Sequence, residues 1–117
     1  MQKVNGIILT NVERVPGHTI DEMLGLVQGS TIRAKHAGKD LLAGFKNIVG
    51  GELKGYTELL QESRTEATSR MVMQATAIGA NAVINVRFTT SSVAQGASEI
   101  LAYGTAVKLS ETTVSGA

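Results

Sequence analysis

The side chains of this sequence whose types and spacing could do chemistry are a row of glutamates, two histidines and a few cations. Glu58, Glu62 and Glu66 repeat every four residues, so they lie on one side of a helix, where carboxylates could hold a hard cation. Side chains along one exposed helix splay apart, however, and Glu66 precedes Arg70 by four residues, the spacing of a surface ion pair. The row therefore favours a solvated helix face over a metal site.

The histidines and the absence of cysteine restrict the metal and nucleophile chemistry. His18 and His36 are eighteen residues apart, and neither has a second His or Cys at zinc-ligand spacing. Without cysteine the chain has no disulfide, no thiolate metal site and no cysteine nucleophile. It also lacks a G-x-S-x-G motif, a P-loop and a G-x-G-x-x-G loop. We therefore predict a protein that is not an enzyme and that holds no cofactor and no metal ion.

The charge balance indicates which kinds of partner the chain could bind. Eleven lysines and arginines against ten aspartates and glutamates give a net charge of +1, too even for a dedicated nucleic-acid binder. Basic residues are in excess by three over residues 33–54, which could favour an acidic ligand but is more typical of a solvated helix face. Aromatic residues for base stacking are not interleaved with them. We predict no nucleic-acid partner.

No segment predicts insertion into a membrane. The apolar run Ile7–Leu9 is too short for a signal peptide. The longest uncharged stretch, Met71–Val86, is shorter than the roughly 18 residues that a membrane span needs. We expect a cytoplasmic protein with no membrane partner.

Hydrophobic periodicity predicts the elements that must position these side chains. A chain of 117 residues and 12.3 kDa is enough for one domain with a real core. Strands show alternation of period two, and helices show an apolar stripe of period 3.6. The pattern predicts strands at Gly6–Thr10, Met23–Lys35, Ala82–Thr90 and Ser98–Leu109, helices at Lys39–Val49 and Gly55–Ile78, a small-residue loop at Ser91–Ala97 and a polar tail at Glu111–Ala117.

This order, β-β-α-α-β-β, predicts an α+β fold with two helices on one face of a curved, mainly antiparallel sheet. Gly25 and Gly29 inside the long strand indicate a bend, a bulge or a close neighbour. The apolar stripe of the longer helix is interrupted by Ser63, which must lie near the core. We expect residues 1–110 to form a single domain and residues 111–117 a flexible tail.

The last two predicted strands carry apolar side chains on both faces. In Ser98–Leu109, for example, Leu101 and Val107 lie on one face, and Ile100 and Ala106 on the other. The helices can cover only one face, and an exposed apolar face usually marks an interface. The alternative is a sheet that curls and covers itself. Of the two explanations, we favour self-association.

A set of spaced motifs resembles a known family. The chain contains Ile48–Gly51, then Tyr56 with Leu60, Arg64 and Ala67, then Ala77–Val83, and finally Gly104–Val107. Together these resemble the YbjQ-like family of small bacterial and archaeal proteins, over residues 17–108. The resemblance implies a two-layer, dodecin-like subunit. It also implies a homopentamer in which strands of neighbouring subunits join a barrel-like assembly.

The resemblance carries the label "putative heavy-metal-binding". Some members look to have a Cys in the strand that here reads Glu22–Gly25, and Leu24 occupies that place. Because soft metals favour thiolate ligands, the label transfers poorly to this chain.

Our first hypothesis is a non-enzymatic, homo-oligomeric scaffold or small-ligand binder, with a pentamer preferred. The alternatives are a metal-binding protein and an enzyme with its site between subunits. Tyr56 and Arg64 are the candidate ligand-binding residues. Arg64 is a permanent cation that could hold a carboxylate or phosphate, so a small anionic ligand is the partner that it would suit.

Overall fold

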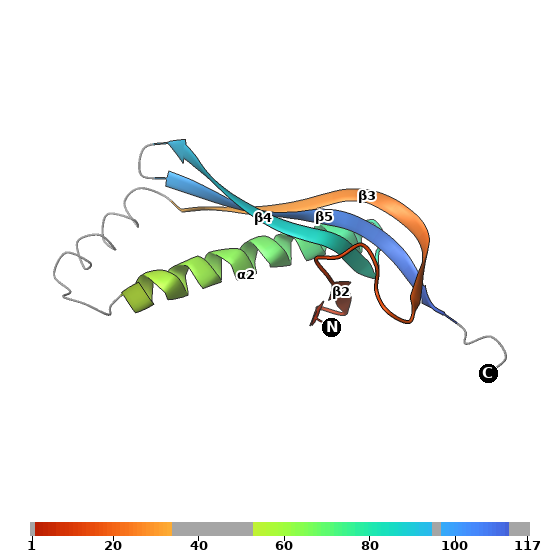
Figure 1. The fold of residues 1–117 in the computed structure, drawn as a ribbon. Coiled ribbons are helices and arrows are strands. Elements are labelled where there is room, and N and C mark those ends of the chain that lie inside the picture. Colours follow the sequence, from red (N-terminus) through yellow and green to blue (C-terminus); the bar gives the residue numbers. More distant parts are fainter. Residues whose placement is uncertain (1, 34–52, 95–96, 113–117) are drawn as a thin grey trace.

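A long helix lies beneath one face of a long, bent sheet in the computed structural model (Figure 1). The structure describes residues 2–33, 53–94 and 97–112. Within them the elements are β1 (Gln2–Val4), β2 (Ile7–Leu9), β3 (His18–Arg33), α2 (Leu53–Ala77), β4 (Ala82–Ala94) and β5 (Ala97–Glu111).

The sheet has five strands in the order β1-β2-β4-β5-β3. Strand β5 pairs antiparallel with β3 on one side and β4 on the other. The β1–β2 pair is also antiparallel, whereas β2 pairs parallel with β4. The predicted α+β class and mainly antiparallel sheet are thus confirmed, with the correction that the sheet is mixed.

Two parts of the predicted element order need correction. The described residues contain one helix, α2, rather than two on the same face, and the helix predicted at Lys39–Val49 lies outside the described residues. Before α2 the order is β-β-β, because β1 was not predicted. A strand of three residues is too short to show periodicity. Its signal is the Asn5-Gly6 dipeptide, whose positive φ angles of 50° and 81° close a two-residue hairpin to β2.

The last two strands are longer than predicted. Strand β4 runs to Ala94 and β5 begins at Ala97, so the prediction of a loop at Ser91–Ala97 is wrong for most of that range. Serine and threonine blurred the alternation there, yet the backbone pairing continues to the Ala94–Ala97 pair. At the other end Glu111, assigned above to the tail, is the last residue of β5.

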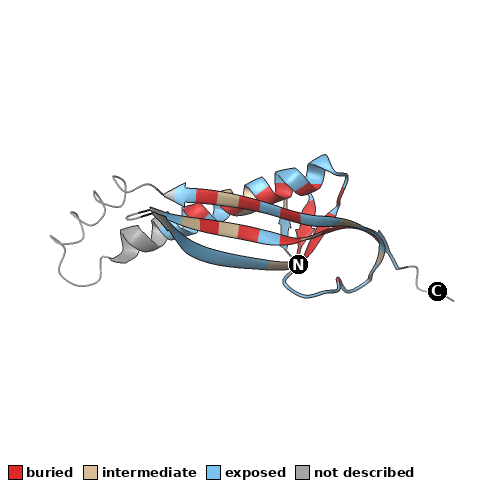
Figure 2. Ribbon diagram, turned by 90° about the horizontal axis from the view of Figure 1, so that it is seen from above, coloured by how far each residue is buried: buried red, intermediate tan, exposed pale blue. Residues whose placement is uncertain are grey.

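Burial alternates along β5 and the second half of β3, and the buried positions lie mostly where α2 covers the sheet (Figure 2). In β5, Ile100, Ala102 and Ala106 are buried in the same core as residues of α2, as the alternation predicts. We call the opposite side of the sheet, which faces away from α2, the open face.

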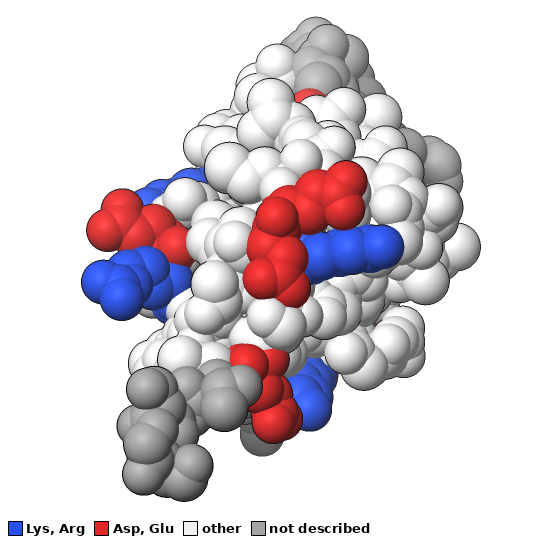
Figure 3. Space-filling model, turned by 90° about the vertical axis from the view of Figure 1, so that its right-hand side faces the viewer, with Lys and Arg blue, Asp and Glu red and all other residues white. Residues whose placement is uncertain are grey.

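The surface carries mixed charge. On the side shown in Figure 3, acidic and basic side chains lie next to one another rather than in a patch of one sign. Among the described residues, no helix is long and apolar enough to cross a membrane.

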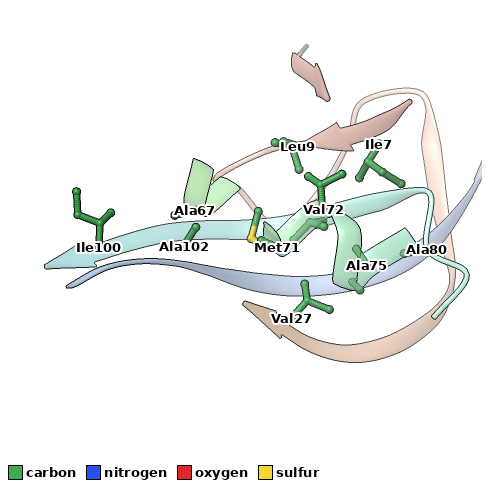
Figure 4. Close-up of a cluster of buried hydrophobic side chains, with 12 residues drawn as sticks. Ile7, Leu9, Val27, Ala67, Met71, Val72, Ala75, Ala80, Ile100 and Ala102 are labelled. Carbon is green, nitrogen blue, oxygen red and sulfur yellow. The ribbon is translucent and has the colours of Figure 1, made fainter. Parts of the chain in front are cut away.

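The core between α2 and the sheet is built from small and medium side chains (Figure 4). Ser63, Ala67, Met71 and Ala75, spaced four apart along α2, are fully buried, which confirms that Ser63 lies near the core. Leu60, three residues before Ser63, and Ile78, which follows the last residue of α2, are exposed. Because three of the four residues in this row, Ser63, Ala67 and Ala75, are small, α2 can approach the sheet closely.

Gly29 shows how close this approach is. A Cβ at Gly29 would lie 2.2 Å from the carbonyl oxygen of Ala67 and 2.3 Å from the amide nitrogen of Met71. Any side chain here would therefore push α2 off the sheet. This confirms the prediction of a close neighbour at one of the glycines inside the long strand.

A bulge in β4 changes which of its side chains face α2. Between Ile84 and Arg87 the pairing with β5 slips, and Asn85 has a positive φ of 54°. The extra residue shifts the alternation by one. Ile84 therefore lies on the open face, while Val86 packs against the core between α2 and the sheet. A Cβ at the facing Gly104 would lie 2.9 Å from the Ile84 carbonyl oxygen, so the bulge needs a glycine opposite it.

The chain covers one end of the open face itself. Val15, in the segment between β2 and β3, is 4% exposed and packs on a second buried cluster. We call this region the covered end; its other buried members are Ile8, Ala82, Ile84, Val107 and Leu109.

Side chains of α2 occupy the outer edge of β3. The Gln28 amide donates a hydrogen bond of 2.7 Å to Oε1 of Gln74, and Arg70 donates one of 2.5 Å to the Ser30 carbonyl oxygen. An exposed strand edge is a template for pairing with another strand. Here two of its backbone groups are already bonded.

Candidate functional site

The residues that the structure describes form two candidate sites, one on each side of the sheet. The first is a groove between α2, the β1–β2 hairpin and β4. Helix α2 packs mostly against β3, less against β5 and least against β4. A trough therefore remains between the helix and β4, and the β1–β2 hairpin forms its other wall.

We call this trough the hairpin groove. It consists of two hollows of about 390 Å³ and 470 Å³ that share Gln2, Thr68 and Phe88. The other described residues that line it are Val4, Leu9, Thr10, Asn11, Gln61, Arg64, Thr65, Ser69 and Val86.

Arg64 is one of the two residues that we predicted to bind a ligand, and the structure places it in this groove. Its side chain is exposed, and its guanidinium makes no hydrogen bond or ion pair with any residue that the structure describes. Its backbone carbonyl accepts a hydrogen bond of 2.8 Å from the Thr68 hydroxyl. The cation is therefore available to a ligand.

Tyr56, the other predicted residue, lies on α2 eight residues before Arg64. At about 1.5 Å of helix rise per residue, their Cα atoms are roughly 12 Å apart. The Tyr56 side chain lies outside what the structure describes. Of the two predicted residues, only Arg64 is among the described residues that line the groove.

Sequence reasoning missed Phe88, Gln2 and the hydroxyl side chains of the groove. Simple alternation along Ala82–Thr90 places Phe88 on the same face as Ile84, and the β4 bulge moves it to the α2 side of the sheet. The hydroxyls did carry a signal, since Thr65, Thr68 and Ser69 have the i, i+3, i+4 spacing of one helix face.

The second candidate site is the part of the open face that no described residue covers. Leu26 and Ile32 on β3 are 82% and 57% exposed, and Tyr103 on β5 is 38% exposed. They lie on the open face because their neighbours Val27 and Thr31 point toward α2. Leu101, Tyr103 and Leu26 also line a hollow of about 620 Å³. We call Leu26, Ile32, Leu101 and Tyr103 the bare end.

The predicted carboxylate row and histidines do not form a site in the described part of the chain. Glu66 bonds Arg70 at 2.5 Å, as the spacing predicts. Nδ1 of His18 lies 2.9 Å from the Pro16 carbonyl oxygen, and His36 falls outside the described residues. Among the described residues, no three His, Cys, Asp or Glu side chains gather where they could hold an ion.

Comparison with known proteins gives the family. The chain is 64% identical over 101 residues to a UPF0145 protein of Hahella chejuensis, which covers 86% of this chain and 97% of that protein. A UPF0145 protein of Archaeoglobus fulgidus is 59% identical over 103 residues, covering 88% of this chain and 95% of the relative.

A solved structure shares the fold. The crystal structure of a protein of unknown function from Pediococcus pentosaceus, of the DUF74 family, superposes with a TM-score of 0.60. It is 14% identical and covers 91% of this chain and 100% of its own. The family profile described as "Putative heavy-metal-binding" matches residues 7–110. The chain therefore belongs to the YbjQ-like family, the UPF0145 proteins of bacteria and archaea.

Proposed function

We propose that this protein is a non-enzymatic homo-oligomer whose subunits associate through the bare end of the open face. The observation that carries the proposal is the exposure of Leu26, Ile32 and Tyr103 on one side of one sheet. The preferred subunit count, five, comes from the family resemblance.

The energetics favour contact at this face. Burying a fully exposed leucine or isoleucine side chain contributes about 1.5–3 kcal/mol. Large side chains clustered at the centre of a contact, with polar neighbours around them, match the anatomy of protein interfaces. Here Gln28, Ser30 and Thr89 are the polar neighbours of Leu101 and Tyr103 across the strand pairs.

A metal-binding role is the alternative that the family description suggests. Soft metals favour thiolate and thioether ligands, and this chain has no cysteine. Its described residues bring no three potential ligands together. The donor set does not fit a heavy-metal site, so we derive no function through a metal.

Light scattering on the purified protein tests the assembly. We expect a mass several times 12.3 kDa, with fivefold preferred. Leu26→Glu should reduce the mass to that of one subunit, because a carboxylate would have to be buried in the contact. Met73→Glu is the matched control, since Met73 is 66% exposed on α2, away from the open face. A monomeric wild-type protein at micromolar concentration would contradict the proposal.

A further inference from the structure

We propose that the hairpin groove binds a small organic anion. Arg64 would hold its carboxylate or phosphate group, and Phe88 would pack against a flat apolar part of the same molecule. The inference does not depend on the proposed assembly, because the groove lies on the α2 side of the sheet, whereas the side chains of the bare end point away from α2.

Helix α2 and strand β4 carry three arginines, and these differ in their partners. Arg70 is bonded to Glu66 and to the Ser30 carbonyl oxygen, and Arg87 donates to the carbonyl oxygens of Asn11 and Val86. These two guanidiniums have structural partners. Arg64 has none among the described residues, although a guanidinium offers five N–H donors in a plane that matches a carboxylate or phosphate.

The surroundings of Arg64 favour a negative ligand. No described residue that lines the groove is acidic, so Arg64 gives it a charge of +1. Glu62 and Glu66, the acidic residues of α2 two positions before and after Arg64, line an adjoining hollow that shares Gln61 and Thr65 with the groove. Glu66 is already paired with Arg70.

The groove wall also supplies neutral hydrogen-bonding groups. Thr65, Thr68 and Ser69 present hydroxyls along one side of α2, and Gln2 faces the groove from β1. The hydroxyls of Thr65 and Ser69 make no hydrogen bond within the described residues, so they can donate to a ligand. A phosphate or carboxylate has more acceptor sites than one arginine can satisfy, and these hydroxyls can fill the rest.

An aromatic side chain completes the site. Phe88 is 48% exposed and lines both hollows, with Val4 and Val86 beside it. A half-exposed ring next to a free cation suits a ligand with a flat apolar body and a charged end. The hollows, about 390 Å³ and 470 Å³, lie within the size range of small-molecule sites.

Phenyl phosphate is the probe that carries both features. Its titration into isotope-labelled protein, followed by amide chemical shifts, should move the resonances of Gln2, Thr65 and Thr68 together. Inorganic phosphate lacks the ring and phenol lacks the charge, so each should bind at least about fivefold more weakly. Benzoate is the carboxylate arm, and the tighter of benzoate and phenyl phosphate identifies the preferred anion.

Three variants decide the roles of the residues. Arg64→Gln should weaken phenyl phosphate about tenfold or more, because it removes the charge-assisted bonds. Phe88→Thr should weaken phenyl phosphate about fivefold but leave inorganic phosphate unchanged. Arg14→Gln is the control, since Arg14 is exposed in the segment before β3 and does not line the groove.

Three results would overturn the inference. They are the absence of shifts with either anion at millimolar concentration, shifts that map outside the groove, and equal affinity in Arg64→Gln. Circular dichroism on each variant checks that the fold is intact. The mass of each variant, measured in parallel, separates loss of the site from loss of the assembly.

Discussion

The two ends of the open face differ although the same strand crosses both. At the covered end, Val107 of β5 is 0% exposed because the segment that carries Val15 lies over it. At the bare end, Tyr103 of the same strand and face is exposed, with Leu26 beside it. Both ends show the same alternation in the sequence. What differs is whether another part of the chain lies over them.

The difference between the covered end and the bare end answers a question that the sequence left open. Apolar residues on both faces of the last strands could indicate association or a sheet that covers itself. The structure supports self-covering for the half that includes Val107 and Leu109, and it leaves the other half exposed. The two halves should therefore respond differently to the same substitution.

Val107→Glu should give the largest effect. The carboxylate would be buried in the second cluster without a partner, which costs about 3–5 kcal/mol. A domain of this size has a stability of only about 5–15 kcal/mol. We expect a protein that is unfolded or melts far below the wild type by circular dichroism. A melting temperature close to that of the wild type would show that the covered end is not a core.

Leu101→Glu, six residues earlier on the same strand and face, should have a different effect. Leu101 belongs to the bare end, where the carboxylate can still reach water in a single subunit. We expect the fold to persist by circular dichroism while light scattering gives a mass near 12.3 kDa. If this variant unfolds as Val107→Glu does, the distinction between the two ends is wrong.

The sequence predicted those parts of the fold that depend on local pattern. Alternation gave both faces of β5 correctly, and the position of Ser63 in the core followed from the helical stripe. It failed at β4, where the extra residue at Asn85 shifts the faces by one. A bulge depends on pairing with a distant strand, here at Gly104, so local periodicity cannot locate it.

The candidate site was predicted only in part, for a similar reason. Arg64 could be selected because a cation is recognisable by type. Phe88 reaches the groove only because the β4 bulge turns it to the α2 side of the sheet. Gln2 reaches it only because β1 is part of the β1–β2 hairpin. The segment that covers Val107 likewise contributes one buried apolar residue, Val15, which shows no periodicity.

Val15→Ala measures how much the covering segment contributes. Removing two methyl-sized groups from a buried valine should lower the free energy of unfolding by about 1.5 kcal/mol, measured by urea denaturation. Val12→Ala, in the same segment but with an exposed side chain, should change it by less than about 0.5 kcal/mol. Equal effects at the two positions would mean that the segment does not act as a lid on the covered end.

Amide exchange should give a smaller, graded contrast. Ile84 and Val107 lie in paired strands over a buried cluster, so their amides should exchange slowly. Ser91 and Ser92, near the far end of the β4–β5 hairpin, have exposed side chains and should exchange at least about tenfold faster. Slow exchange at the two serines in the native assembly, lost in Leu101→Glu, would extend the contact beyond the bare end.

The last prediction is that metal ions change neither the covered end nor the bare end of the open face. Soft ions such as Cu(I) favour thiolate and thioether ligands, and the chain has no cysteine. Met71 is buried in the core while Met73 is exposed, so the two cannot chelate one ion. His18 could serve Zn²⁺ only if symmetry brought copies from several subunits together. We therefore expect no submicromolar binding of Zn²⁺ or Cu(I) by calorimetry on chelator-stripped protein, and no change in its mass on stripping. Tight binding that is abolished by His18→Ala or His36→Ala would instead indicate that a metal ion joins the subunits.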